Sequence, residues 1–297
     1  MAGEGNAVEI VTRHGRLVRR ALACWALVIY VFLFSPIVLL ILLSFNKNRY
    51  GTFPITGWTT YWFTSIANSP DLQSAIKTSL RVAAEVTLVS TVVGTAAAFT
   101  LVRSRLPFRT AFRIGFTLPI MIPGVLIGVS LLTFLRQVLN VPLSIETVVI
   151  GQSVYTTPFV LLIVASRLQG FDRNLERAAS DLGANALRTF RYVILPLIAP
   201  AVLAGAVFAF TLSLDEFVIT FFIIGPEITL PIYIYTQIKF GITPAINAVA
   251  TLLIFTSLTI AGVGLLIPKL VAMPVRHVRS RRARRMQSAA PAAPSSA

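Results

Sequence analysis

The chain has 297 residues, of which 56% are hydrophobic and only 12% are charged, and its net charge is +15. A soluble domain usually carries about 25% charged residues, so this composition excludes an ordinary soluble protein and indicates that lipid surrounds much of the chain. The single cysteine, Cys24, excludes an internal disulfide, and no cluster of metal ligands is present because the two histidines lie in the basic ends.

Six apolar segments are long enough to cross ~30 Å of hydrocarbon. The first has a basic flank typical of a signal peptide, but its apolar run is too long and lacks a small-residue cleavage site, so we expect a retained anchor. A further apolar stretch, 217–225, either extends the fifth helix or forms a short re-entrant segment. We therefore expect an all-α, polytopic bundle of six transmembrane helices within residues 21–270. The six segments are 21–45, 79–102, 114–135, 146–165, 194 to beyond 209, and 247–267.

The distribution of lysine and arginine predicts the orientation of these spans. With six crossings, 20 of the 26 lysines and arginines fall on the side that holds both termini and the second and fourth loops. We therefore expect tail 1–20 and tail 271–297 in the cytoplasm, the second of them disordered because it is basic and then rich in Ala, Pro and Ser. The net charge then suits anionic lipid headgroups and requires no nucleic acid.

The loop 167–192, which is cytoplasmic in this topology, differs from the other loops because it combines charge with a helical apolar stripe. Asp172 or Asn174 can cap a first short helix, and Gly183 suits its end. Asn185 can then cap a second short helix. Such a pair either lies on the membrane surface or its own bundle, or docks a partner protein. The stripe consists of Leu175, Ala178, Ala179, Leu182 and Ala186.

Part of this loop resembles the EAA loop in permease subunits of binding-protein-dependent ABC importers. The family pattern is Glu-Ala-Ala, three residues, Gly, nine residues, then Ile, any residue, Leu-Pro. Val193 replaces the family's Ile, and Arg177 stands at the usual Glu position, with Glu176 one place earlier. The residues that match the pattern are Ala178, Ala179, Gly183, Leu195 and Pro196.

The resemblance implies that the loop 167–192 contains a coupling helix, which inserts into a groove of a cytoplasmic ATP-binding subunit. The chain itself has no phosphate-binding loop of the type GxxxxGK[ST], so we expect no enzymatic activity and no bound cofactor. ATP and Mg²⁺ would be used by a partner ATPase dimer. The other implied partners are a second, homologous permease and an extracytoplasmic solute-binding protein, in the inner membrane of a bacterium. The implied ATPase-coupling residues are Glu176, Arg177, Ala178, Ala179, Asp181, Gly183, Leu195 and Pro196.

Two further segments, 44–63 and 211–235, are similar to permeases of spermidine/putrescine importers, which favours a polyamine substrate. Asp215 and Glu216 follow Pro196 by a helix of about 30 Å, in the outer part of the fifth span. Adjacent carboxylates are costly beside lipid, so we expect them to face a cavity or a partner, where they can bind ammonium groups. Alternatively, Asp215 ends a helix and the nearby aromatic residues form an interfacial belt. The aromatic candidates for cation–π contacts are Trp58, Trp62, Tyr155, Tyr233 and Tyr235.

Other readings of the sequence stay open. Within the same family, the solute can instead be an amino-acid-like amine, iron or thiamine. A secondary transporter driven by an ion gradient needs ion sites near the midplane and often has internal repeats, and the sequence has no clear repeat. A membrane enzyme needs paired catalytic residues or metal ligands, and neither is evident.

Overall fold

The computed structural model describes residues 3–48, 53–104, 107–170, 172, 174–240, 244–259 and 262. These residues form helices, and the one β-bridge among them joins Asn46 and Trp58. The chain divides into two compact units, which are described separately: Met1–Ser69 with Gln237–Ile254, and Pro70–Thr236 with Phe255–Ala297. The predicted all-α class is therefore confirmed for the described residues.

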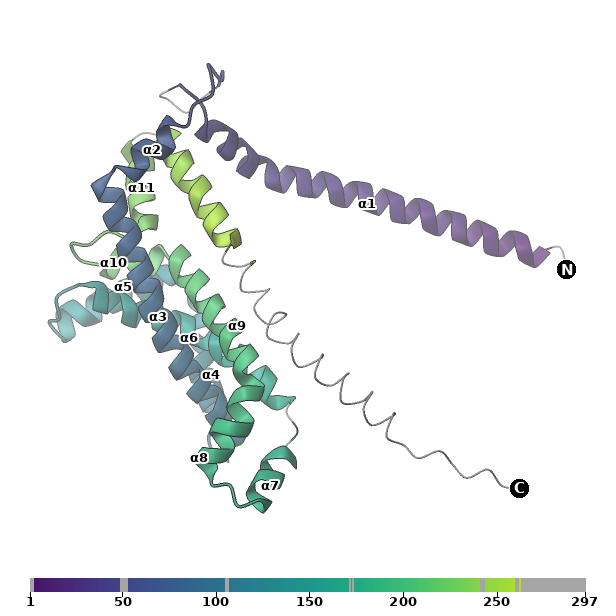
Figure 1. The fold of residues 1–297 in the computed structure, drawn as a ribbon, viewed down its shortest axis with the longest axis vertical. Coiled ribbons are helices and arrows are strands. Elements are labelled where there is room, and N and C mark those ends of the chain that lie inside the picture. The colour runs from purple at the N-terminus through teal and green to yellow at the C-terminus, as the bar shows by residue number, and fades with distance from the viewer. Residues whose placement is uncertain are drawn as a thin grey trace, which may run out of the picture. The chain divides into compact units, whose positions relative to one another are not determined.

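The first unit contains α1 (Gly3–Ser44) and α2 (Tyr61–Ala67). Within α1, the stretch Val18–Ser44 is long and apolar enough to cross a membrane, which confirms the first predicted span (Figure 1). The connection to α2 is held by hydrogen bonds, because the Trp62 indole donates to the carbonyl of Asn46 at 2.7 Å. The described residues just after α1 are therefore joined by hydrogen bonds to those at the start of α2.

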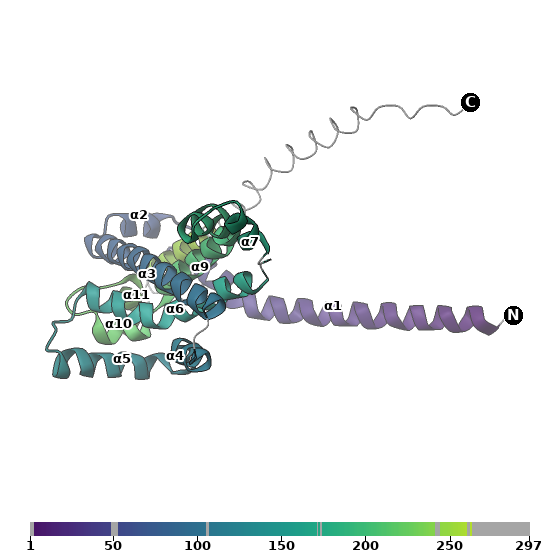
Figure 2. The same ribbon diagram turned by 90° about the horizontal axis from the view of Figure 1, so that it is seen from below.

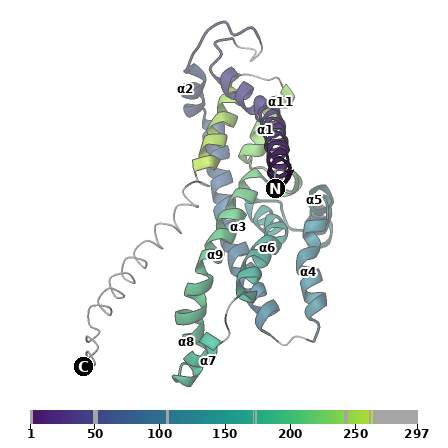
Figure 3. The ribbon, with the colours of Figure 1, turned by 90° about the vertical axis from the view of Figure 1, so that its right-hand side faces the viewer.

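Three long helices form the centre of the second unit: α3 (Pro70–Arg103), α6 (Ile145–Gln169) and α9 (Leu195–Asp215). They lie side by side (Figures 1 and 3). A β-carbon on Gly94 of α3 would lie 2.8 Å from the Val160 side chain of α6, so the close approach of these two helices requires glycine. Buried aliphatic residues of all three helices then form a continuous core.

The third predicted span, 114–135, is not one continuous helix. The structure divides it into α4 (Arg109–Met121), α5 (Gly124–Thr133) and the π-helical turn η1 (Phe134–Val138), with a bend of 103° between α4 and α5. The break lies at Ile122 and Pro123, because proline disfavours helical backbone in the residue before it, and Ile122 is extended.

The region after α9 contains α10 (Val218–Ile223) and α11 (Leu230–Phe240). Viewed from below, α10 lies beside α5 and α6 (Figure 2). Ser213 of α9 and Thr220 of α10 both hydrogen-bond Gln152, and the carbonyl of Ile223 lies 2.6 Å from the Thr147 hydroxyl, nearer the start of α6. The stretch 217–225 therefore continues the direction of α9 after a break and does not turn back.

The predicted count of six transmembrane helices is not reproduced in full by the described residues. Four helices are long and apolar enough to span a membrane, and the bent pair of α4 and α5 raises the number to five. The sixth predicted span, 247–267, is described as the shorter helix Pro244–Thr259 and residue 262, and the rest of it lies outside the described residues. The described residues are those of a polytopic membrane protein with four or five candidate spans.

Candidate functional site

The predicted coupling loop forms two short helices at one end of the central bundle, α7 (Asn174–Asp181) and α8 (Ala186–Thr189) (Figure 3). Asp172 caps the first, because its carboxylate accepts a hydrogen bond from the backbone N–H of Asn174 at 2.9 Å. Asn185 caps the second, and its side chain accepts from the N–H of Arg188 at 2.9 Å. Both caps agree with the sequence-based prediction.

Gly183 ends α7 in the left-handed region, at φ +81°. The N–H of the next residue, Ala184, donates to the carbonyl of Ala179 at 3.0 Å, which is the bond that closes a helix C-terminus of this kind. The sequence predicts a second short helix after Asn185 and a fifth span that begins near residue 194. Instead, α8 runs through the π-helical turn η2 (Phe190–Ile194) directly into the long apolar helix α9.

Glu176 links α7 to the central bundle. Its carboxylate lies 2.6 Å from the guanidinium of Arg103, the last residue of α3, and the two side chains are 27% and 9% exposed. Arg177, by contrast, is exposed, like Ala178 and Asp181. The sequence did not indicate Arg103 as a partner of α7, because Arg103 and Glu176 are far apart in the chain.

Exposed leucines lie in the turn after α7 and on α8. Leu182 is 89% exposed and Leu187 is 73% exposed. Exposed leucines grouped with arginines are typical of a surface that contacts another molecule. Leu195 and Pro196, which match the end of the EAA pattern, are exposed in the first turn of α9.

A second candidate site is a cavity of about 500 Å³ where α9 ends and α10 begins. It brings together three of the predicted substrate-path residues, Asp215, Glu216 and Tyr155. Tyr235 packs on Phe217, another lining residue, with ring centroids 5.0 Å apart. Tyr233 is half-buried on α11 and does not line the cavity, and Trp58 belongs to the first compact unit.

The two adjacent carboxylates have different surroundings. The Glu216 carboxylate accepts hydrogen bonds from the backbone N–H groups of Ile219 at 2.9 Å and Thr220 at 3.0 Å, so it caps α10. Asp215 is exposed toward the cavity, and no residue in the described parts of the chain forms a hydrogen bond or ion pair with its carboxylate. An ammonium group in the cavity can therefore pair with Asp215 without breaking an existing bond.

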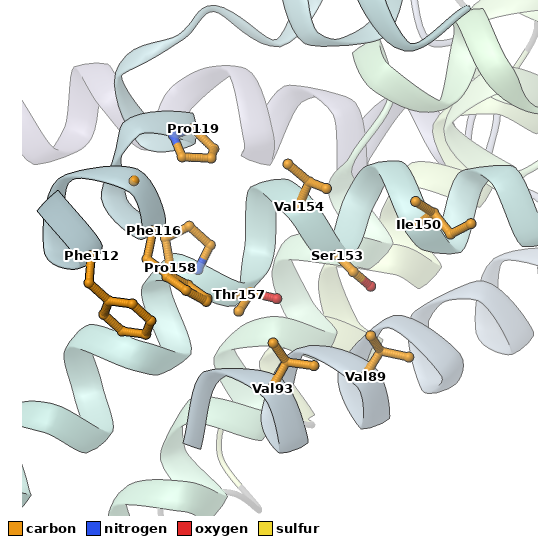
Figure 4. A pocket seen from close by; sticks show the side chains of 11 residues that line it. Val89, Val93, Phe112, Phe116, Pro119, Ile150, Ser153, Val154, Thr157 and Pro158 are labelled. Atoms are coloured by element: carbon orange, nitrogen blue, oxygen red, sulfur yellow. The ribbon is translucent and has the colours of Figure 1, made fainter. Parts of the chain in front are cut away.

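A larger cavity, of about 590 Å³, lies between α3, α4 and α6. Figure 4 shows its lining, which is almost entirely aliphatic and aromatic: Val89, Val93, Phe112, Phe116, Pro119, Ile150, Val154 and Pro158, with the hydroxyls of Ser153 and Thr157 as its polar groups. It offers no carboxylate to a cation, so the smaller cavity beside Asp215 is the better candidate for a charged solute.

Comparison with known proteins places these features in a class of membrane transport subunits. Residues 90–272 match the family described as "Binding-protein-dependent transport system inner membrane component". The chain belongs to this family and is a permease subunit of an ABC importer, a multi-pass protein of the bacterial inner membrane.

Several relatives support this assignment. The chain is 36% identical over 245 residues to the spermidine/putrescine transport system permease protein PotC of Escherichia coli (strain K12), covering 82% of this chain and 91% of the relative. It is also 36% identical over 241 residues to the putrescine transport system permease protein PotI of the same strain, covering 77% and 85%. Relatives of this similarity cover most of the chain, including both candidate sites.

Solved structures share the fold at lower sequence identity. A bacterial ABC transporter that imports alginate matches with a TM-score of 0.65 and 16% identity, covering 87% of this chain and 98% of that chain. The MetNI methionine ABC transporter matches with a TM-score of 0.55 and 19% identity, covering 68% and 99%. The fold of this chain is therefore that of an importer's transmembrane subunit.

Proposed function

We propose that this permease subunit forms half of a translocation path for a polyamine such as spermidine or putrescine. The observation that carries the proposal is the Asp215 carboxylate, which faces a cavity of about 500 Å³ and has no partner among the described residues. Tyr155 lines the same cavity and supplies a ring for a cation–π contact. The two polyamine permeases that resemble this chain support the same substrate class.

We further propose that α7 and α8 dock in a groove of an ATPase subunit, where Glu176, Arg177, Ala178, Ala179, Asp181 and Gly183 shape the contact and Leu195 and Pro196 connect it to α9. The exposed leucines of this face support the docking role. The ATPase dimer would use ATP and Mg²⁺, and its closure would move α9 through the continuous segment from α8 to η2.

The remaining partners in this proposal are a second, homologous permease and an extracytoplasmic solute-binding protein. A match to a bacterial alginate ABC transporter in complex with a solute-bound periplasmic protein, with a TM-score of 0.67, supports the proposal of a solute-binding protein. Both termini of this chain would lie in the cytoplasm, because the loop with α7 and α8 must reach the ATPase. The basic residues of this side then face anionic lipid headgroups.

The test is uptake by the complete transporter, reconstituted in proteoliposomes with its ATPase, second permease and binding protein. We expect ATP-dependent uptake of labelled spermidine or putrescine, with weak competition by thiamine, iron or amino acids. Asp215→Asn removes the charge at nearly constant size, and we expect uptake to fall about tenfold or more with normal assembly. Uptake that follows an ion gradient without ATP, or prefers another solute, would contradict the proposal.

A further inference from the structure

A buried chain of hydrogen bonds joins α6 to both sides of the break between α9 and α10. Its centre is Gln152 of α6, which is 1% exposed. The Ser213 hydroxyl of α9 donates to the Gln152 side-chain oxygen. The Gln152 side-chain nitrogen in turn donates to the Thr220 hydroxyl of α10 at 2.7 Å. One side chain therefore holds the last turn of α9 and the first turn of α10 together.

This chain of hydrogen bonds continues to the Glu216 carboxylate, which caps α10. The Thr220 hydroxyl lies 2.9 Å from a carboxylate oxygen of Glu216 and 3.2 Å from the carbonyl of the same residue, and because both oxygens accept, its single proton goes to Glu216. Thr220 can therefore only accept from Gln152, which fixes the nitrogen of the Gln152 amide toward α10 and its oxygen toward Ser213. In this arrangement the hydroxyls of Ser213 and Thr220 and both ends of the Gln152 amide take part in a hydrogen bond.

In the same arrangement, the two adjacent carboxylates have different roles. Glu216 receives two backbone N–H groups and the Thr220 hydroxyl, so moving it would leave buried donors without a partner. Asp215, one residue earlier, is the last residue of α9, and its direction depends on how the break is held. The break itself is extended at Glu216, with φ −72° and ψ 112°.

We propose that Gln152 is a positioning residue for cation recognition: through Ser213, Thr220 and Glu216 it holds the break so that Asp215 presents its carboxylate to the cavity. This inference rests on the proposed function, in which a protonated amine pairs with Asp215. A polar side chain within an apolar span is costly, and the hydrogen bonds that Gln152 makes to two helices offset this cost.

The tight packing around α10 agrees with this role. A β-carbon on Gly128 of α5 would lie 2.7 Å from the Phe222 ring, and one on Gly151 of α6 would collide with Ile223. The helix α10 is therefore packed closely against both α5 and α6. The hydrogen bonds of Gln152, Thr220 and Glu216 at its first turn, called the clamp below, define its position along these two helices. A loss of the clamp then changes the direction of Asp215 more than it changes the packing of the bundle.

The experiment compares two substitutions at Thr220 in the complete reconstituted transporter. Thr220→Val keeps the shape and removes the hydroxyl, whereas Thr220→Ser keeps the hydroxyl. We expect Thr220→Val to raise the KM for polyamine uptake about tenfold, the size expected when a buried bond to a charged group is lost, with Vmax nearly unchanged. Thr220→Ser should restore a KM within about twofold of the unsubstituted transporter. Gln152→Met, of similar size, should behave like Thr220→Val.

The outcomes separate this inference from the proposed function. If Asp215→Asn raises KM and Thr220→Val does not, the clamp has no positioning role and the inference is wrong. If Thr220→Val lowers Vmax and protein yield at constant KM, its role is structural only, which also overturns the inference. If the transporter does not carry polyamines, the proposed function is wrong, and the inference that rests on it is wrong as well. Should Thr220→Val not assemble, Ser213→Ala removes one bond of the same chain and is judged by the same change in KM.

Discussion

Gly183 connects α7 to α8 in a backbone conformation that residues with a β-carbon rarely adopt. Its φ is +81°, and an added β-carbon would meet no atom within 4 Å, so the cost of a substitution there comes from the backbone and not from crowding. A left-handed residue with a β-carbon costs about 1–2 kcal/mol, and β-branched residues tolerate the region least. The end of α7 is therefore sensitive to the type of residue at 183.

We predict that Gly183→Val lowers the amount of solute transported per ATP hydrolysed, because the direction of α7 changes relative to α8. Gly183→Asn is the matched control, since asparagine adopts the left-handed region far more readily. Uptake and ATP hydrolysis are measured in the same proteoliposomes. A valine variant with the same ratio as the unsubstituted transporter, together with normal stimulation of the ATPase, would show that this conformation has no role in coupling.

At the same scale, local patterns predicted the caps and stops of the helices well. The helix end at Gly183 and the cap at Asn185 depend on residues within a few positions, so the sequence contains the information. Both Asp215 and Glu216 were expected to face a cavity or a partner, with a helix end at Asp215 as the alternative. Asp215 does end α9 and also lines the cavity, whereas the capping role of Glu216 was not predicted. The Thr220 hydroxyl, four residues after Glu216, bonds that carboxylate, and it is held in turn by Gln152 of α6, a helix distant in sequence.

At the scale of elements, the ion pair between Arg103 and Glu176 connects the end of α3 with α7. The pair is largely sheltered, with side chains 9% and 27% exposed, so water screens it less than a surface pair. It gives α7 a second connection to the bundle, in addition to its continuity with α8. Removal of either partner leaves a partly buried charge without its counterpart.

We predict that Glu176→Arg reduces coupled transport, because it places two positive charges at this contact. The double variant Arg103→Glu with Glu176→Arg should recover part of the loss, with an interaction term of about 0.5–3 kcal/mol in a double-mutant cycle on thermal stability in detergent. The single variant Arg177→Glu, on the neighbouring exposed residue, serves as a comparison, because it should not respond to the change at Arg103. Strict additivity of the two substitutions would argue against the pair.

The bend between α4 and α5 shows what apolar length leaves undetermined. The hydropathy of residues 114–135 indicates that they suit lipid, but it does not determine the direction of the chain after Pro123. A proline in a membrane helix is compatible with either a mild kink or a break, and neighbouring helices decide between them. Here α5 packs against α10, which lies in the stretch 217–225 that the sequence left as either an extension of the fifth helix or a short re-entrant segment.

At the scale of the whole chain, composition and charge bias predicted a polytopic membrane protein, and the EAA pattern predicted its family, which the comparison confirms. These properties are sums over many residues, so single errors at element boundaries do not affect them. The two candidate sites lie toward opposite ends of the second unit: the ion pair joins α7 to the last residue of α3, whereas the cap of α10 lies near the first turns of α6.

This arrangement makes the orientation of the chain testable with single cysteines. Cys24 is the only native cysteine, so Cys24→Ser provides an unlabelled background. Phe108, which is 77% exposed, lies between α3 and α4, and Ile228, which is 45% exposed, lies between α10 and α11. We predict that a membrane-impermeant maleimide labels Ile228→Cys in intact cells with a permeabilised outer membrane, because the positive-inside rule places this loop outside.

Phe108→Cys should react only after the inner membrane is also opened, because the same rule places the loop between α3 and α4, like α7 and α8, in the cytoplasm. The two variants differ in the side of the membrane and not in exposure alone, so labelling of both after lysis controls for reactivity. Labelling of Phe108→Cys in intact cells would place α7 and α8 outside, where no ATP-hydrolysing subunit can reach them, and the proposed coupling would then be wrong.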